Sequence, residues 1–301
     1  MSVENRGNLS SGVLRTMSSV ETNLRHPAER PVFLAYAVLN VLLMAASIFI
    51  VVRGSDWLRV HPRVAHYRGK IQVLAIAAIV TLPLTVFLRN TRHALDRGKS
   101  IAISREQLPE IYTILERHCQ KLGIEALPEL YFSDMSMKKP AQAYKSWKCD
   151  YIVLSSKFLQ PNLQPMLPVF AFWLGCAIGC LRLKHVSWPT ELMLTYVDKL
   201  PHLSNPLRRL FSYSEDRYGA FLAPEGLPGL IAVASGRLML PQVNTADYLK
   251  QVRAYGGIWA GLAMLIEPEP TVARRIRALF EAGLLKTEPP SRREEHSPLA
   301  S

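Results

Sequence analysis

The chain has 301 residues, of which 49% are hydrophobic and 20% are charged, and its formal net charge is +12. This length suits about two domains of ordinary size. The apolar content suggests a soluble domain joined to a few membrane spans, while the positive charge fits either an anionic membrane surface or a nucleic acid. The sequence contains no RNA-binding signature, zinc-finger spacing or internal repeat, so we expect a membrane partner and no nucleic acid.

Residues 1–30 are polar and rich in Ser, Asn, Glu and Arg, which predicts a disordered N-terminal tail. No apolar run opens this segment, so we expect no cleavable signal peptide.

Two uncharged runs predict a membrane anchor over residues 31–88. The first transmembrane helix covers residues 31–52 and the second about residues 71–88. Each run is long enough to cross a hydrocarbon core about 30 Å thick as a helix. Pro83 lies inside the second run, where membrane helices tolerate proline. A buried helix of a soluble protein is the alternative for each run.

Basic residues flank the two spans unequally, with five in the loop between them and eight on the outer flanks. The loop holds Arg53, Arg59, Arg63, Arg68 and Lys70, and the outer flanks hold Arg15, Arg25, Arg30, Arg89, Arg92, Arg97, Lys99 and Arg105. Since basic residues concentrate on the cytoplasmic side, this bias predicts that both termini are cytoplasmic. We therefore expect an integral membrane protein, in the inner membrane if the source is bacterial, with its large domain in the cytoplasm.

Residues 89–285 predict one mainly helical α+β domain with a small sheet. A helix follows Ser104, and "ELYFSD" and "DYIVLSS" have the β-branched and aromatic composition of strands. Later helices are expected at 207–223, 226–236, 245–265 and 270–285. The last of these is basic, and we expect Arg274, Arg275 and Arg277 on a solvated face or beside lipid head groups. The polar residues 286–301 predict a disordered C-terminal tail.

Residues 158–181 carry no charge, so by length alone they could form a third span. Pro161, Pro165 and Pro168 lie in the first half of the run, which predicts a shorter helix that begins near Pro168. We favour a buried core helix, with a third span as the alternative.

This helix contains "LGCAIGCLRLKH", residues 174–185, in which Cys176 and Cys180 stand four residues apart. Zinc peptidases use two His at this spacing, because both imidazoles then point to one side of a helix. A Glu after the first His polarises the metal-bound water. In this chain Ala177 takes the place of that Glu.

In this order and setting the chain resembles the HtpX-type membrane zinc metallopeptidases, relatives of the CAAX prenyl endopeptidase. The resemblance covers roughly residues 89–285 and implies a gluzincin metallopeptidase-like domain. The segments that carry it, in family order, are "RHALDRGKSIAISREQLPEIYTILERHCQKLGI", "DYIVLSSKFLQ", "LGCAIGCLRLKHVSW", "FSYSEDRYGAFLA", "GLPGLIAVASGRL", "ADYLKQ" and "PEPTVARRIRALFEAGL".

Carried over residue by residue, the family's zinc site is lost at each essential position. The resemblance puts Cys176 and Cys180 at the first two ligand positions, Ala177 at the general-base position and Ser212 at the third ligand position. Asp216 keeps the Asp of the last motif, whose role in the family is to support the ligands from behind. The frame around these positions is kept at Gly175, Gly179, His185, Tyr213, Arg217 and Ala220.

Three roles for the paired cysteines can be compared. Two thiolates at this spacing can chelate zinc, but Ser212 is a poor third ligand and His185 is expected well around the helix. Hydrolysis would lack the base at Ala177, a loss that costs roughly 10²- to 10⁴-fold in rate. A cysteine nucleophile needs an electropositive setting, which this apolar helix does not offer. We favour inert buried thiols, with no metal and no cofactor.

The other cysteines, Cys119 and Cys149, lie far away in sequence. Four cysteines are too few for a disulfide scaffold in a chain of this length, so we expect reduced thiols in a cytosolic domain.

The sequence thus predicts a catalytically inactive, membrane-anchored homologue of the HtpX-type peptidases that binds polypeptide or a protein partner, or forms a homo-oligomer. The predicted edge strand for an added polypeptide consists of Tyr151, Ile152, Val153, Leu154 and Ser155. The alternative is an active membrane zinc metalloendopeptidase with Cys ligands. A channel role is disfavoured, because the spans carry no ionisable residue.

Overall fold

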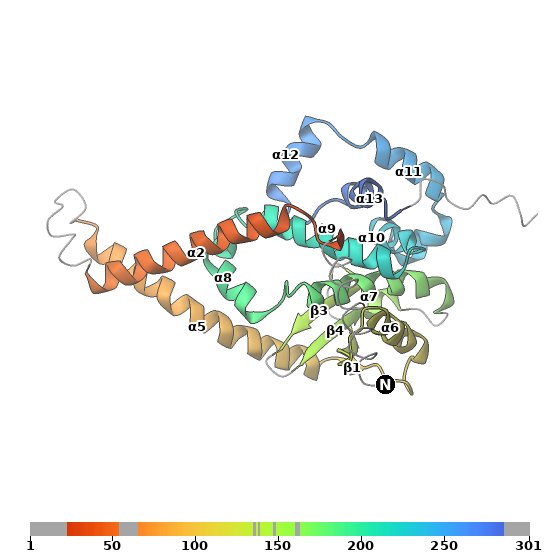
Figure 1. Cartoon of the computed structure of the whole chain (residues 1–301), viewed down its shortest axis with the longest axis horizontal. Helices are drawn as coiled ribbons and strands as arrows, with labels where there is room; N and C mark the ends of the chain where they lie inside the picture. Colours follow the sequence, from red (N-terminus) through yellow and green to blue (C-terminus); the bar gives the residue numbers. More distant parts are fainter. Residues whose placement is uncertain are drawn as a thin grey trace, which may run out of the picture.

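Figure 1 shows the computed structural model of the chain. The structure describes residues 23–53, 66–134, 137, 139–146, 149–159 and 163–285. The predicted C-terminal tail, residues 286–301, and residues 1–22 of the predicted N-terminal tail lie outside the described residues.

The described part is mainly helical with a small mixed sheet, as the sequence predicts. Its α-helices are α2 (Glu29–Val52), α5 (Arg68–Gly98), α6 (Pro109–Lys121), α7 (Leu167–Arg182), α8 (Trp188–Lys199), α9 (Asn205–Leu222), α10 (Leu227–Met239), α11 (Thr245–Ala254), α12 (Ile258–Ile266) and α13 (Val272–Glu281). Its strands are β1 (Ile101–Ala102), β2 (Glu129–Ser133), β3 (Ala141–Lys145) and β4 (Asp150–Ser155), and its 3-10 helices are η1 (Ser156–Phe158), η2 (Gln164–Met166) and η3 (Leu240–Gln242).

The helices α2 and α5 pack on each other and project away from the rest of the protein (Figure 1). Their most apolar stretches have a mean hydropathy of 2.4, yet 11% of that stretch in α2 and 6% in α5 are buried within the protein. Exposed apolar helices of this length are typical of membrane-spanning segments. The protein is therefore membrane-associated. Pro83 does not end α5, which continues beyond the predicted span to Gly98.

Asn40 joins the anchor to α8. Its side-chain amide donates to the carbonyl oxygen of Leu192 over 3.0 Å and accepts from the backbone N–H of Tyr196 over 2.9 Å. The Tyr196 hydroxyl in turn donates to the carbonyl oxygen of Ala78 in α5, over 3.0 Å. These bonds satisfy polar groups of Asn40 and Tyr196 that are buried within the protein, and they hold α8 against both α2 and α5.

The helix α7 is the centre of the core. The segment Gln164–Arg182 is long and apolar enough to cross a membrane, but 72% of its most apolar stretch is buried inside the protein. It packs against α6, α9, α10 and β3. The helix begins at Leu167 with Pro168 in its first turn, where proline costs no hydrogen bond. Because protein covers α7, the buried-helix interpretation fits the structure better than a third span.

In the described residues the sheet has the strand order β1-β2-β4-β3. The strand β4 pairs in parallel with β2 and in antiparallel fashion with β3, so the prediction that residues 151–155 form an edge is wrong. Tyr151, Ile152, Val153, Leu154 and Ser155 are all buried, as the residues of an interior strand are. The edge strands are β1 and β3. The sequence of β3, "AQAYK", lacks the β-branched residues that are typical of strands.

Residues 23–30, predicted as the end of the tail, pack against α9 instead. Leu24 is buried, and the backbone N–H of His26 donates to the hydroxyl of Ser214 over 2.9 Å. The guanidinium of Arg217 donates to the carbonyl oxygen of Arg25 over 3.2 Å. The polar composition of this segment reflects partners on α9, because polar groups can be buried when they are hydrogen-bonded.

The predicted helix over residues 245–265 is two helices, α11 and α12, because Gly256 and Gly257 interrupt it. Gly257 has a φ of 100°, in the region that favours glycine.

The helix α12 packs against α9. Arg209 of α9 donates to the carbonyl oxygen of Glu267, which directly follows α12, over 3.0 Å. The outer face of α12 is apolar, with Ile258 81% and Trp259 83% exposed.

Candidate functional site

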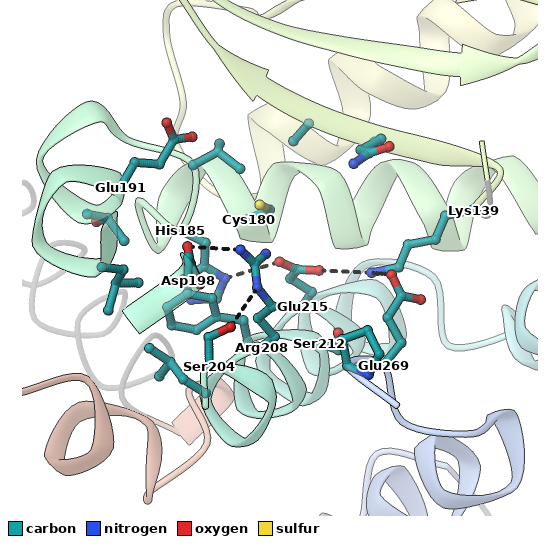
Figure 2. Close-up of a pocket in the computed structure, with 18 of the residues that line it drawn as sticks. Lys139, Cys180, His185, Glu191, Asp198, Ser204, Arg208, Ser212, Glu215 and Glu269 are labelled. Atoms are coloured by element: carbon teal, nitrogen blue, oxygen red, sulfur yellow. Dashed lines mark hydrogen bonds and ion pairs between the residues drawn. The ribbon is translucent and has the colours of Figure 1, made fainter. Parts of the chain in front are cut away.

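A cavity of about 610 Å³ lies between α5, β3, α7, α8 and α9 (Figure 2). Its walls come from segments far apart in the sequence. Thr85 of α5 is one of the lining residues, so the cavity adjoins the membrane anchor. The central helix α7 supplies one wall and α9 the facing one.

Small residues allow α7 and α9 to approach closely enough to share this cavity. A methyl group on Gly179 would lie 2.5 Å from Cβ of Tyr218, and one on Gly175 would lie 2.9 Å from Cα of Gly219. Real Cβ atoms do not come that close, so these positions depend on having no side chain. The glycine spacing of the "LGCAIGC" segment therefore sets the distance between the two walls.

The structure brings together four positions that the resemblance assigns to the zinc site. Cys176, Ala177 and Cys180 of α7 line the cavity, and Ser212 of α9 lies on the opposite wall. All four are buried. Buried thiols lack solvation of the thiolate, and burial raises the pKa of both Cys176 and Cys180 well above the ordinary value.

Asp216 lies behind the cavity rather than on its wall. It accepts a hydrogen bond from Nε of Arg275 in α13 over 2.7 Å, and a second one from the same guanidinium. The thiol of Cys176 is directed at the same carboxylate, with Sγ 3.8 Å from Oδ1. Arg275 is buried and stacks over the ring of Trp173, 4.7 Å from its centroid. The expectation of a solvated or lipid-facing Arg275 is therefore wrong.

His185 also lines the cavity, contrary to the expectation that it lies well around the helix from Cys180. The helix ends at Arg182, and Lys184 has a left-handed backbone with a φ of 62°. This turn brings the chain back, so that the N–H of His185 donates to the carbonyl oxygen of Cys180 over 3.1 Å. The imidazole then stacks on Phe211 of α9, with ring centroids 3.9 Å apart.

Carboxylates hold both nitrogens of the His185 ring. Nδ1 lies 3.1 Å from Oε1 of Glu215 in α9, and Nε2 lies 3.1 Å from Oε1 of Glu29, the first residue of α2. Burial alone would lower the pKa of His185, but these hydrogen bonds raise it above the ordinary value. Around them, Arg25 pairs with Glu29 over 3.2 Å, and Lys139 lies 3.8 Å from Oε2 of Glu215.

Cys180, His185 and Glu215 form a cluster whose ligand atoms all lie within 4.8 Å of one another. Sulfur, imidazole nitrogen and carboxylate oxygen are all zinc donors. The sequence analysis did not identify Glu215. The spacing could have identified Glu215, because it follows the third ligand position, Ser212, by three residues and so lies on the same helix face.

The far end of the cavity is polar and lies between α8 and α9 (Figure 2). Arg208 forms an ion pair with Asp198 over 2.9 Å, and Ser204 lies beside it. Glu191 pairs with Arg89 of α5 over 3.1 Å. The cavity thus has an apolar wall on α7 and hydrogen-bonding groups on α8 and α9, the combination that orients a bound ligand.

Comparisons of the chain with protein-family models, with curated proteins and with solved structures find no match. The resemblance to the HtpX-type peptidases therefore stays a prediction that the quoted segments carry.

Proposed function

We propose that the chain is a membrane-anchored polypeptide-binding protein, a catalytically inactive relative of the HtpX-type zinc metallopeptidases. The observation that carries the proposal is the position of β3, an edge strand whose residues Ala141, Gln142 and Ala143 line the cavity. An extended polypeptide can add to such an edge as a further strand, with backbone hydrogen bonds supplying affinity.

The pairing of β3 directs its free backbone groups outward. The N–H of Ser155 donates to the carbonyl oxygen of Pro140 over 2.9 Å, which marks that pair as hydrogen-bonded. Hydrogen-bonded and non-bonded pairs alternate along an antiparallel ladder. Ala141 and Ala143 therefore turn their backbone N–H and C=O groups away from β4. Lys145 obeys the same alternation, because its carbonyl oxygen accepts from Arg89 on the outer side.

The cavity walls support binding without hydrolysis. Ala177 can neither accept nor deliver a proton, and losing a positioned base costs roughly 10²- to 10⁴-fold in rate. A zinc endopeptidase with atypical ligands is the second candidate, and the cluster of Cys180, His185 and Glu215 is the observation that favours it.

The position of the cavity beside the anchor supports a partner that is itself at the membrane. Thr85 of α5 lines the cavity. The basic flanks of the spans support a cytoplasmic large domain, in the inner membrane of a bacterium. The apolar face of α12 is exposed, and we include it in the bilayer-facing surface. The polypeptide bound is a protein partner, a membrane-protein client or a second copy of this chain.

Binding can be tested with fluorescein-labelled casein, an unfolded polypeptide, and the full chain in detergent. We expect the anisotropy of the label to rise with the wild-type chain and the casein to stay intact. The variant Ala143→Pro removes an outward N–H from β3 and should weaken binding at least tenfold. Ala102→Pro is the matched control, because β1 is the opposite edge of the sheet and binding there should be unchanged.

Two results would overturn the proposal. Equal casein binding by the wild type and Ala143→Pro would show that β3 does not bind the polypeptide. Casein cleavage that a zinc chelator stops would establish the peptidase alternative instead.

The orientation is tested separately, with a reporter fused to each terminus in a bacterial host. Cytoplasmic signals from both ends are expected. A periplasmic C-terminus would contradict the cytoplasmic placement.

A further inference from the structure

We infer that Cys180, His185 and Glu215 form a zinc-binding site, distinct from the i,i+4 pair of cysteines that the sequence suggests. The three ligand atoms lie within 4.8 Å of one another, on residues that all line the cavity. Figure 2 shows the carboxylate of Glu215 reaching across from α9 toward His185, with Cys180 on the adjoining wall of α7. This site does not depend on whether β3 binds a polypeptide.

The donor set suits zinc among the common divalent ions. A thiolate, an imidazole and a carboxylate bind zinc at about 2.0–2.3 Å in tetrahedral geometry, which spaces neighbouring donors roughly 3.3–3.7 Å apart. Nδ1 of His185 and Oε1 of Glu215 are already 3.1 Å apart. The side chains of Cys180 and Glu215 adjust to bring the remaining donors to this spacing. Calcium and magnesium prefer oxygen donors alone.

Glu29 orients the histidine for this role. Zinc-binding histidines commonly donate their other ring N–H to a carboxylate, which fixes the tautomer. Here the Nε2–H of His185 donates to Glu29, whose position is held by Arg25 and by the hydroxyl of Ser214. Nδ1, which donates to Glu215 without metal, faces the side of the cavity, and loss of its proton would turn its lone pair toward the zinc.

The charges also suit a dication. The thiolate of Cys180 and the carboxylate of Glu215 neutralise Zn²⁺, so the occupied site adds no net charge to a buried region. Lys139 lies near Oε2 of Glu215, 3.8 Å away, which leaves Oε1 for the metal. Metal binding displaces two protons, one from the Cys180 thiol and one from Nδ1 of His185, and the second loss frees Oε1 of Glu215 from its hydrogen bond.

Cys176 lies outside this ligand set. Its Sγ is directed at Asp216, 3.8 Å away, and lies where a side chain on Gly219 would stand. It has the same residue type, helix and burial as Cys180. Cys176 is therefore a matched control for Cys180.

The test is zinc content, measured by elemental mass spectrometry on the full chain in detergent without polypeptide, after dialysis against zinc chloride and then zinc-free buffer. We expect about one zinc per chain in the wild type and in Cys176→Ala. Cys180→Ala and Glu215→Gln should fall to background. Glu29→Gln keeps the ligands and should weaken zinc affinity about 10- to 100-fold.

X-ray absorption at the zinc edge of the wild-type protein provides a measurement that needs no variant to fold. One sulfur with nitrogen and oxygen donors supports the inference. Two sulfur donors, or equal zinc loss in Cys176→Ala and Cys180→Ala, would assign the metal to the cysteine pair. Wild-type protein that retains no zinc would overturn the site altogether. None of these outcomes bears on casein binding at β3.

Discussion

Asp216 and Arg275 form a buried ion pair that joins α9 to α13, with Arg275 Nε 2.7 Å from Asp216 Oδ2. Their side chains are 1% and 3% exposed. A charge buried to this degree is stable in the fold only with its partner, because removal of one leaves the other without solvent or counter-ion.

We expect Asp216→Asn to lower the free energy of unfolding by about 3–5 kcal/mol, because it leaves the Arg275 guanidinium buried without its counter-ion. Denaturation in detergent, followed by circular dichroism, measures the loss. The control is Glu116→Gln, which breaks the exposed ion pair with Arg105 and should cost less than about 1 kcal/mol. Similar losses in the two variants would show that the Asp216 pair is solvated.

Gly179→Ala should destabilise the protein by about 1–3 kcal/mol, because the added methyl overlaps the side chain of Tyr218 and forces α7 and α9 apart. The same denaturation experiment applies. Gly69→Ala is the control, since Gly69 lies in α5 with open space around it and alanine favours a helix there. A neutral Gly179→Ala would mean that the two helices are not in close contact.

His118 predicts a stability loss in acid. Burial lowers its pKa, although the hydrogen bond from Nε2 to the carbonyl oxygen of Ala171 opposes the shift. The unfolded chain, with a His pKa of about 6.5, then binds the proton more readily than the folded protein. The free energy of unfolding is therefore at its full value above about pH 6.5 and falls as the pH drops toward the folded pKa.

Melting temperatures in detergent between pH 7.5 and pH 5 measure this effect. His118→Gln keeps a donor for Ala171 and should flatten the pH dependence, while His66→Gln, at an exposed position, should leave it unchanged. If the melting temperatures of the wild type and His118→Gln change equally with pH, His118 is not the cause of the acid destabilisation.

We expect α12 to contact lipid through Trp259, because this residue is 83% exposed on an apolar helix. In nanodiscs with doxyl-labelled lipid, wild-type fluorescence should be quenched more than that of Trp259→Leu. Acrylamide, a quencher in water, should affect the two alike. The reverse pattern would place α12 in solvent.

Much of the architecture could be predicted because it depends on residues that are close together in the sequence. The uncharged runs predict α2 and α5, and the proline positions predict where α7 begins. The spacing of Cys176 and Cys180 predicts that they share one helix face, because residues four apart do so. The resemblance, not spacing, places Ser212 across from them.

The remaining parts depend on contacts between distant segments or on single backbone angles. His185 reaches the cavity through the left-handed turn at Lys184, which no residue type there requires. Its partner Glu29 is 156 residues away and looks like the end of a polar tail. Arg275 lies in a basic stretch that looks like a surface helix. It is buried because it pairs with Asp216, which is 59 residues earlier in the sequence.

The contact between Glu29 and His185 has a consequence for how the protein is made. Glu29 stands at the start of α2, so it is synthesised before α7 and α9. The Glu29 carboxylate is therefore present before His185 and Glu215 are made. A chain in which α2 is misplaced cannot form the contact between Glu29 and His185. For the same reason, a soluble fragment that begins after the second span lacks one wall of the His185 environment, and its properties cannot stand for those of the whole protein.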